Sequence, residues 1–166
     1  MDMILRVGIL TASDRAARGE RPDLSGPALV QLVTAQGWKV ERTAVLPDEL
    51  SDLRATLTAW ADEGGVDVIL TTGGTGFGPH DVTPEATRQV IEREAPGLAE
   101  AMRFESLKFT PHAMLSRALA GTRGNVLIIN LPGSPRAAVQ NFQVIIPVLP
   151  HAVELLQDRP NADRHH

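Results

Sequence analysis

The sequence predicts an α/β protein: a single three-layer domain whose mostly parallel sheet carries helices on both faces. Three short runs are continuously apolar, as strands buried on both faces are, namely Ile4–Leu10, Val66–Thr71 and Val126–Leu131. Helical patterns lie between these runs, and such alternation is typical of parallel strands joined by right-handed crossovers. Because 166 residues suit one domain rather than two, we expect this domain to span residues 1–166.

The other elements follow in chain order. The first helix is expected to begin at Ser25, which can act as its N-cap with Pro27 in the first turn, and to stop at Gly37. The next strand, Trp38–Leu46, alternates more between apolar and polar residues, which places it near an edge of the sheet. A second helix is expected to begin at Asp48 or Ser51 and to end at the glycine pair 64–65. A third opens at the Thr-Pro-Glu sequence 83–85, and the break at 95–97 ends it.

Charge and composition exclude several classes of function. Sixteen basic and 20 acidic residues give a net charge of −4, which argues against a nucleic-acid partner. The apolar runs are too short to cross a membrane, and the absence of cysteine excludes disulfides and thiol catalysis. We therefore expect a cytoplasmic protein. His80, His112 and His151 lie far apart, and His165 and His166 end the chain, so no histidine metal site is predicted.

Each predicted strand is followed by a loop rich in small or acidic residues. The loops read, in order, TASDRAARGERPDLSG, LPDE, TTGGTGFGPHDVTP and NLPGSP. The carboxyl ends of parallel strands meet at one edge of the sheet, where such folds bind their ligands. The sequence therefore predicts a ligand site at this edge.

The third loop carries four glycines within residues 73–78. They could form tight turns, or they could free the backbone to turn its N–H groups toward an anion. The preceding strand and the following helix start favour the anion site. The loop matches neither a P-loop nor a dinucleotide-binding fingerprint. A bulky β-branched residue at Gly74 or Gly76 is then expected to block an anion more than it harms folding.

Asp48 and Asp81 have two interpretations that the spacing leaves open. Each precedes an expected helix and could be structural, Asp48 as a helix cap and Asp81 as a capping or turn aspartate. Two carboxylates on adjacent loops could equally hold a magnesium ion that bridges phosphates, since Mg²⁺ commonly uses only one or two protein carboxylates.

The loop motifs, together with PHAMLSRALAG and the extended form TTGGTGFGPHDVTPEA, occur in the order seen in one family. From about Ile4 to Gln157 the chain resembles the molybdopterin adenylyltransferases of molybdenum-cofactor biosynthesis, the MogA/MoaB family. The resemblance implies a nucleotidyltransferase in which the terminal phosphate of molybdopterin attacks the α-phosphorus of ATP and pyrophosphate leaves. It implies ATP as co-substrate and Mg²⁺ as cofactor.

The resemblance also assigns residues by motif. Asp48 and Asp81 match the family's essential acids, and we expect them to be the catalytic residues and the Mg²⁺ ligands. The expected substrate- and nucleotide-binding residues are Ser13, Asp14, Thr72, Gly73, Gly74, Thr75, Gly76, Ser106, Ser116, Asn130, Pro132, Gly133 and Ser134.

The implied assembly is a homotrimer or a dimer of trimers, with the molybdenum-insertion enzyme as a further partner. The apolar segment Val144–Leu156, interrupted by prolines, is the candidate for packing between copies. The competing hypothesis is a non-catalytic molybdopterin-binding or scaffold protein of the same pathway, and retention of both aspartates favours the enzyme. A nicotinamide-dependent oxidoreductase is disfavoured because the first strand lacks its glycine fingerprint.

Overall fold

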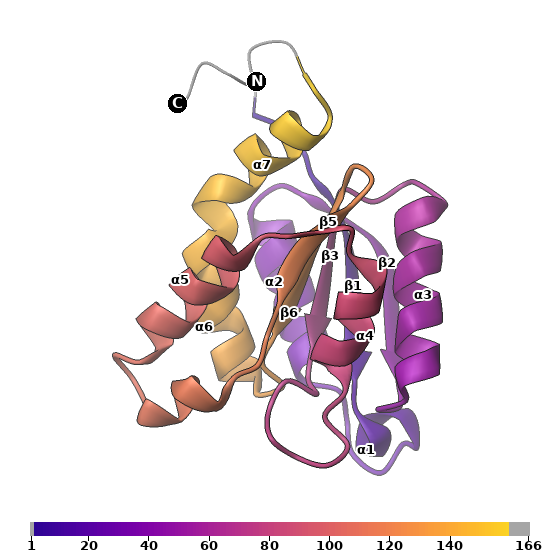
Figure 1. The fold of residues 1–166 in the computed structure, drawn as a ribbon, viewed down its shortest axis with the longest axis vertical. Helices are drawn as coiled ribbons and strands as arrows, with labels where there is room; N and C mark the ends of the chain where they lie inside the picture. Colours follow the sequence, from indigo (N-terminus) through magenta and orange to yellow (C-terminus); the bar gives the residue numbers. More distant parts are fainter. Residues whose placement is uncertain (1, 160–166) are drawn as a thin grey trace.

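The computed structural model describes residues 2–159, which form one α/β domain around a six-stranded sheet (Figure 1). The strand order is β2-β1-β3-β6-β5-β4. Pairing is parallel among β2, β1, β3 and β6, whereas β5 is antiparallel to β6 and β4 is antiparallel to β5. The strands are β1 (Arg6–Ala12), β2 (Lys39–Leu46), β3 (Val68–Thr72), β4 (Arg93–Glu94), β5 (Ala120–Arg123) and β6 (Val126–Leu131).

The predicted fold class is confirmed, and β2 lies at the sheet edge as expected. Two strands were not expected. β4 has two residues and β5 has four, and neither carries an apolar run that distinguishes it from a loop. His165 and His166 lie outside the described residues. Within residues 2–159, no helix has both the length and the apolar character needed to span a bilayer.

Helices cover both faces of the sheet, and one of their predicted boundaries is wrong. The third helix ends at Val90 rather than at 95–97, and Pro96 instead begins a new helix, because proline is well tolerated in a first turn. The helices are α1 (Asp14–Ala17), α2 (Ser25–Ala35), α3 (Leu50–Asp62), α4 (Thr83–Val90), α5 (Pro96–Ser106), α6 (Pro135–Ile145) and α7 (Leu149–Leu156), with 3₁₀ turns η1 (Pro111–Leu115) and η2 (Ile146–Val148).

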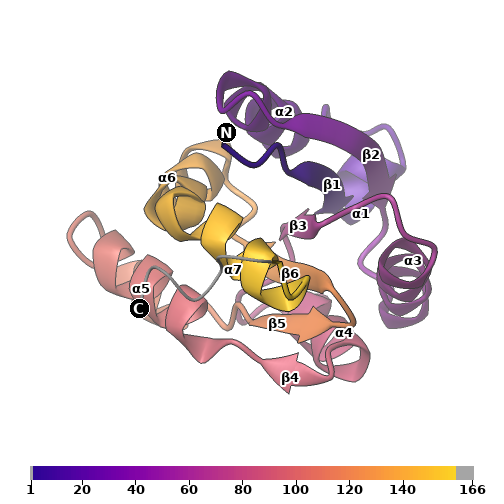
Figure 2. The same cartoon turned by 90° about the horizontal axis from the view of Figure 1, so that it is seen from above.

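Alternation along the buried strands supplies two hydrophobic cores. In β3, Val68 and Leu70 face one core while Ile69 faces the other. The first core is closed by α2, α5, α6 and α7, and the second by α3 and α4, so the sheet lies between two helical layers (Figure 2). Phe142 of α6 is fully buried in the first core and makes an edge-on ring contact with Trp38.

The strand order also determines where a ligand can bind. From β1 the chain crosses to β2 on one side, whereas β3 lies on the other side of β1. The loops after β1 and β3 therefore diverge at the carboxyl edge, and a crevice opens between them.

Candidate functional site

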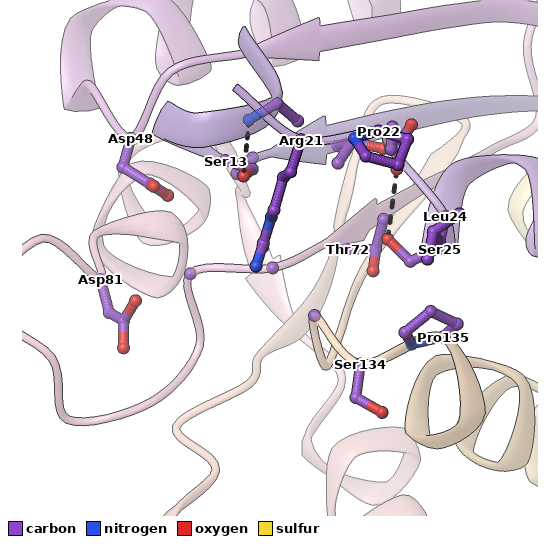
Figure 3. Close-up of a pocket in the computed structure, with 17 residues that line it drawn as sticks. Ser13, Arg21, Pro22, Leu24, Ser25, Asp48, Thr72, Asp81, Ser134 and Pro135 are labelled. Carbon is purple, nitrogen blue, oxygen red and sulfur yellow. Dashed lines mark hydrogen bonds between the residues drawn. The ribbon is translucent and has the colours of Figure 1, made fainter. Parts of the chain in front are cut away.

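A cleft of about 560 Å³ occupies this switch point between the loops after β1, β3 and β6 (Figure 3). Its walls include the loop after β2, through Asp48. Eight of the expected site residues line it: Ser13, Asp48, Thr72, Gly73, Gly74, Asp81, Gly133 and Ser134.

Asp48 is fixed by a reciprocal pair of hydrogen bonds with Asp14. The N–H of Asp48 donates to Asp14 Oδ1 at 2.8 Å, and the N–H of Asp14 donates to Asp48 Oδ2 at 3.1 Å. The second carboxylate oxygen, Oδ1, is buried and has no hydrogen-bond partner among residues 2–159. Burial raises the pKa of Asp48, and the nearby carboxylates of Asp14 and Asp81 raise this pKa further.

Asp81 closes a turn at the end of the glycine loop. Its Oδ2 accepts the N–H of Gly78 at 2.9 Å, and its own N–H donates to the carbonyl of Gly78 at 3.0 Å. Neither aspartate caps a helix: the N-cap positions of α3 and α4 are Glu49 and Val82, and neither makes a side-chain capping bond. The capping interpretation is therefore wrong for both aspartates.

The acidic end of the cleft fits a divalent cation. A buried carboxylate oxygen that has no partner among the described residues and lies near a second carboxylate is a site whose negative charge a cation would offset. No set of three or more His, Cys, Asp or Glu side chains suited to a metal occurs within residues 2–159. Two carboxylates can hold Mg²⁺, which keeps most of its ligands as water or phosphate oxygens.

The opposite end of the cleft favours negative charge. The 11-residue helices α2 and α6 both begin here, and Ser25, Ser134 and Pro135 from their first turns line the wall. Helix N-termini carry a partial positive charge, but at α2 the carboxylate of Asp23, which lines the same wall, already accepts the N–H of Gly26. Arg21 extends across the cleft between these helix ends and the two aspartates (Figure 3). Anionic groups can therefore lie between the helix ends and a cation held by the acids.

Two lining residues were missed by the sequence analysis. Arg21 lies in a long polar loop whose path no local pattern reveals. Asp23, rather than Ser25, supplies the side-chain cap of α2, because its Oδ1 accepts the N–H of Gly26 at 3.0 Å. Its Oδ2 also accepts the hydroxyl of Thr11 at 2.9 Å, which ties the helix start to β1. The sequence did contain a signal for this cap, because Asp23 precedes Gly26, in the first turn of the helix, by three residues.

Backbone conformation and packing alone require glycine at two positions of the glycine loop. Gly73 has a φ of 101°, and a Cβ there would lie 2.3 Å from the carbonyl oxygen of Ala12. Gly74 has a φ of 67°, and its Cβ would lie 2.4 Å from the buried hydroxyl oxygen of Thr83. A substitution at Gly74 would therefore strain the fold itself, which the expectation for this position did not take into account. Gly76 has an ordinary φ, and its Cβ would meet only Asp81 Oδ2, at 3.0 Å.

A second cleft of about 270 Å³ adjoins the first across the glycine loop. The two share a wall, because Gly73 and Gly74 line the first while Thr75 and Gly76 line the second. Five expected site residues line the second cleft: Thr75, Gly76, Ser106, Ser116 and Pro132.

Asp14 and Asn130 line neither of these two clefts. Asp14 lines a neighbouring hollow together with Arg15 and Arg18. Asn130 is fully buried, and its amide nitrogen donates to the hydroxyls of Thr71 and Thr87, both at 2.9 Å. In this structure Asn130 joins β6 to β3 and α4 and does not face an open cavity.

A doubly wound sheet with two adjoining clefts at its carboxyl edge defines an α/β protein that binds its ligand at the topological switch point. Residues 8–151 match the family described as "Probable molybdopterin binding domain", and the chain belongs to this family. The resemblance predicted from the sequence motifs is thereby confirmed.

Relatives and solved structures support the same assignment. The chain is 40% identical over 157 residues to the molybdopterin adenylyltransferase of Helicobacter pylori strain J99, covering 92% of this chain and 88% of the relative. It is 42% identical over 142 residues to the molybdopterin adenylyltransferase of Escherichia coli K12, covering 84% and 72%. The crystal structure of the molybdopterin biosynthesis enzyme MoaB from Thermus thermophilus superposes with a TM-score of 0.89 at 48% identity, covering 95% of this chain and 99% of that one.

Two other relatives are much longer. The chain is 48% identical to the molybdenum cofactor synthesis protein cinnamon of Drosophila melanogaster and 42% identical to gephyrin of Dictyostelium discoideum. It spans about a quarter of their length, namely 25% and 23%.

Proposed function

We propose that this protein is a molybdopterin adenylyltransferase of molybdenum-cofactor biosynthesis. The observation that carries the proposal is the arrangement of the first cleft, in which the carboxylates of Asp48 and Asp81 face the N-terminus of α6, with Arg21 between them. Two relatives about 40% identical over most of the chain bear this name.

In the proposed reaction a terminal phosphate oxygen of molybdopterin forms a bond to the α-phosphorus of ATP. The bond from that phosphorus to the bridging oxygen of the β-phosphate breaks, and pyrophosphate leaves with the electron pair. No oxidant or reductant is needed, and the product is adenylylated molybdopterin. Such a transfer depends on positioning and on charge neutralisation rather than on a covalent nucleophile.

The two clefts divide the substrates between them in this proposal. The first takes the phosphates of ATP, which lie against the starts of α2 and α6. The second takes the pterin, because Ser106, Thr110 and Ser116 offer hydroxyl groups and Arg103 offers a cation within a small cavity. The glycine loop lies between the two clefts, and in this proposal the two reacting phosphates meet beside it.

Asp48 and Asp81 are the proposed catalytic residues and hold Mg²⁺. When bound, the ion offsets the negative charge of the phosphates. Asp48 is already held in position for this role. The N–H of Asp14 binds its Oδ2, and its Oδ1 has no hydrogen-bond partner among the described residues. Asp81 is preset by the N–H of Gly78.

Further parts of the proposal concern assembly and location. We propose a homotrimer or a dimer of trimers in the cytoplasm that passes its product to the molybdenum-insertion enzyme. Support for this partner comes from the cinnamon and gephyrin relatives, in which the matching region lies within chains about four times as long.

The experiment measures pyrophosphate release by the purified chain supplied with molybdopterin, ATP and Mg²⁺. We expect release only when all three are present, because transfer needs both phosphates and the ion together. The omission of molybdopterin measures ATP hydrolysis and serves as the control. Tight binding of molybdopterin without pyrophosphate release would contradict the proposal and favour the scaffold hypothesis.

A further inference from the structure

The side chain of Arg117 binds three residues, two in the loop that follows β3 and one in helix α4. It comes directly after Ser116, which lines the second cleft, but Arg117 itself lines neither cleft. Its Nε donates to the carbonyl of Gly76 at 2.7 Å, and its Nη2 donates to the carbonyl of Asp81 at 2.9 Å. Its Nη1 pairs with the carboxylate of Glu85 in α4. One guanidinium group thus binds both ends of the segment 76–81 and the helix that follows.

The backbone of Arg117 contacts the same loop. Its N–H donates to the carbonyl of Thr75 at 2.8 Å. Residues 76–81 belong to no helix or strand, and Phe77 at their centre is 70% exposed. A loop of this kind has little apolar packing to hold it, so its conformation depends on hydrogen bonds. Within residues 2–159, the hydrogen bonds from the Arg117 guanidinium are the ones that reach residues 76–81 from another part of the fold.

These contacts bear directly on one expected catalytic side chain. Asp81 forms its turn with Gly78, and both residues lie between the two carbonyls that Arg117 binds. Releasing the carbonyls of Gly76 and Asp81 would let the turn move as a unit. The carboxylate of Asp81 would then shift relative to Asp48, which a different loop holds in place.

We propose that Arg117 is a positioning residue that holds Asp81 in register with Asp48 and thereby sets the rate of group transfer. This inference rests on the proposed function, since it assigns Asp81 to the reacting phosphates. Arginine is required rather than any cation, because the planar guanidinium serves three acceptors in three directions at once. A lysine could keep the charge opposite Glu85 but would lose the carbonyls.

The test compares Arg117→Lys with a matched substitution, Arg123→Lys. Arg123 makes a similar fork, with Nε and Nη2 on the carboxylate of Asp62 and Nη1 on the carbonyl of Val90, but it lies at the hairpin between β5 and β6. We expect Arg117→Lys to lower kcat by about 10- to 100-fold, in keeping with a displacement of about 1 Å at a reacting group. The melting temperature should stay near that of Arg123→Lys, whose kcat should equal the parent's.

Two further readouts distinguish positioning from a general structural role. In an Asp81→Asn background, Arg117→Lys should cause little further loss, because it acts through Asp81. Amide hydrogen exchange at Gly78 and Asp81 should accelerate in Arg117→Lys and not in Arg123→Lys. Glu85→Gln, which weakens only one of the three contacts, should accelerate the same amides to a lesser degree, and it provides the test if the lysine variant fails to fold.

Parental turnover in Arg117→Lys, or losses that multiply fully in the double variant, would overturn the inference. Unchanged exchange at Gly78 and Asp81 in both Arg117→Lys and Glu85→Gln would do the same. The exchange measurement needs no substrate. It therefore decides whether Arg117 positions the turn even if the parent protein proves not to transfer an adenylyl group.

Discussion

At the scale of single residues, the carboxylate of Asp48 lies where its charge is disfavoured. Burial is the main cause, and the carboxylates of Asp14 and Asp81 add to it. An acid whose pKa is raised on folding lowers stability while it is ionised. That cost is present above the raised pKa and disappears as the pH falls below the unfolded value of about 3.9. The charge of Asp48 is thus held at the expense of stability, and a cation in the proposed site would offset this cost.

Asp48→Asn should therefore stabilise the protein at pH 7 while it impairs catalysis. Without Mg²⁺ or ATP we expect the melting temperature to rise by roughly 1–3 °C. The difference should shrink as the pH falls, because the parent's Asp48 then becomes protonated. Thermal unfolding of parent and variant between pH 7 and pH 4 measures this. A variant that is less stable at pH 7 would show that the charge of Asp48 serves the fold.

The functional chemistry of individual residues could be predicted only where a motif carried it. LPDE and HDVTPE led to Asp48 and Asp81, and the structure brings both to one cleft. The sequence could not show whether Gly73 and Gly74 are needed for packing or for binding an anion. The atoms that exclude a Cβ at these positions belong to Ala12 and Thr83, which are distant in sequence. Arg117 could not be found either, since its partners Gly76, Asp81 and Glu85 are 32 or more positions away in sequence.

At the scale of elements, the long and continuously apolar strands were predicted and the short ones were not. β3 is buried throughout, and that leaves a clear apolar pattern in the sequence. β4 pairs with β5, and β5 pairs with β6. Strands that depend on such pairing leave little local pattern in the sequence. The start of α2 was predicted correctly, but its cap was assigned to Ser25 when Asp23 makes the bond.

Asp67 joins three elements at the edge of the sheet opposite the clefts. It is buried just before β3, accepts hydrogen bonds from the backbone and guanidinium of Arg6, and accepts another from Gln157 after α7. Burial acts to raise the pKa of Asp67, but the hydrogen bonds and the charge of Arg6 outweigh it and lower the pKa below its ordinary value.

Asp67→Asn should destabilise the fold by about 1–3 kcal/mol at pH 7 and leave kcat unchanged. A lowered pKa contributes stability that is present above the unfolded value of about 3.9 and is lost as the pH falls through the folded value. The difference in the free energy of unfolding between parent and variant should therefore shrink as the pH is lowered. Urea unfolding at pH 7 and pH 3 checks this, and an equal gap at both would contradict the assigned role of the charge.

At the scale of the whole molecule, several large exposed apolar residues lie around the end of α5 and η1. Phe104 is 69% exposed and Met114 is 66% exposed, with Leu107, Phe109 and Leu115 nearby in sequence. The segment expected to serve assembly, Val144–Leu156, buries Ile145, Leu149 and Val153 in the first core and leaves Val148 and Leu155 exposed, so it is a second candidate surface. Apolar residues gathered in this way mark an interaction surface.

We expect the parent protein to be a trimer, or a dimer of trimers, at micromolar concentration and the variant Phe104→Ser/Met114→Ser to dissociate toward monomer. Serine removes apolar area that contact between copies would bury. Ile4→Ser is the matched control, because Ile4 is 58% exposed but lies at the start of the chain. Light scattering gives the mass of each. A monomeric parent, or equal dissociation of the control, would contradict the assignment of this surface.

The central claim is that Asp81 and Asp48 act together in adenylyl transfer, and the most direct measurement identifies the product. Molybdopterin and ATP labelled at the α-phosphate are incubated with the protein and Mg²⁺, and the pterin product is examined by mass and label. We predict that the pterin gains one labelled adenylyl group and that Asp81→Asn lowers its rate of formation by about 10²-fold or more while melting near the parent temperature. Unmodified pterin with the parent protein, or parental turnover by Asp81→Asn, would contradict the claim.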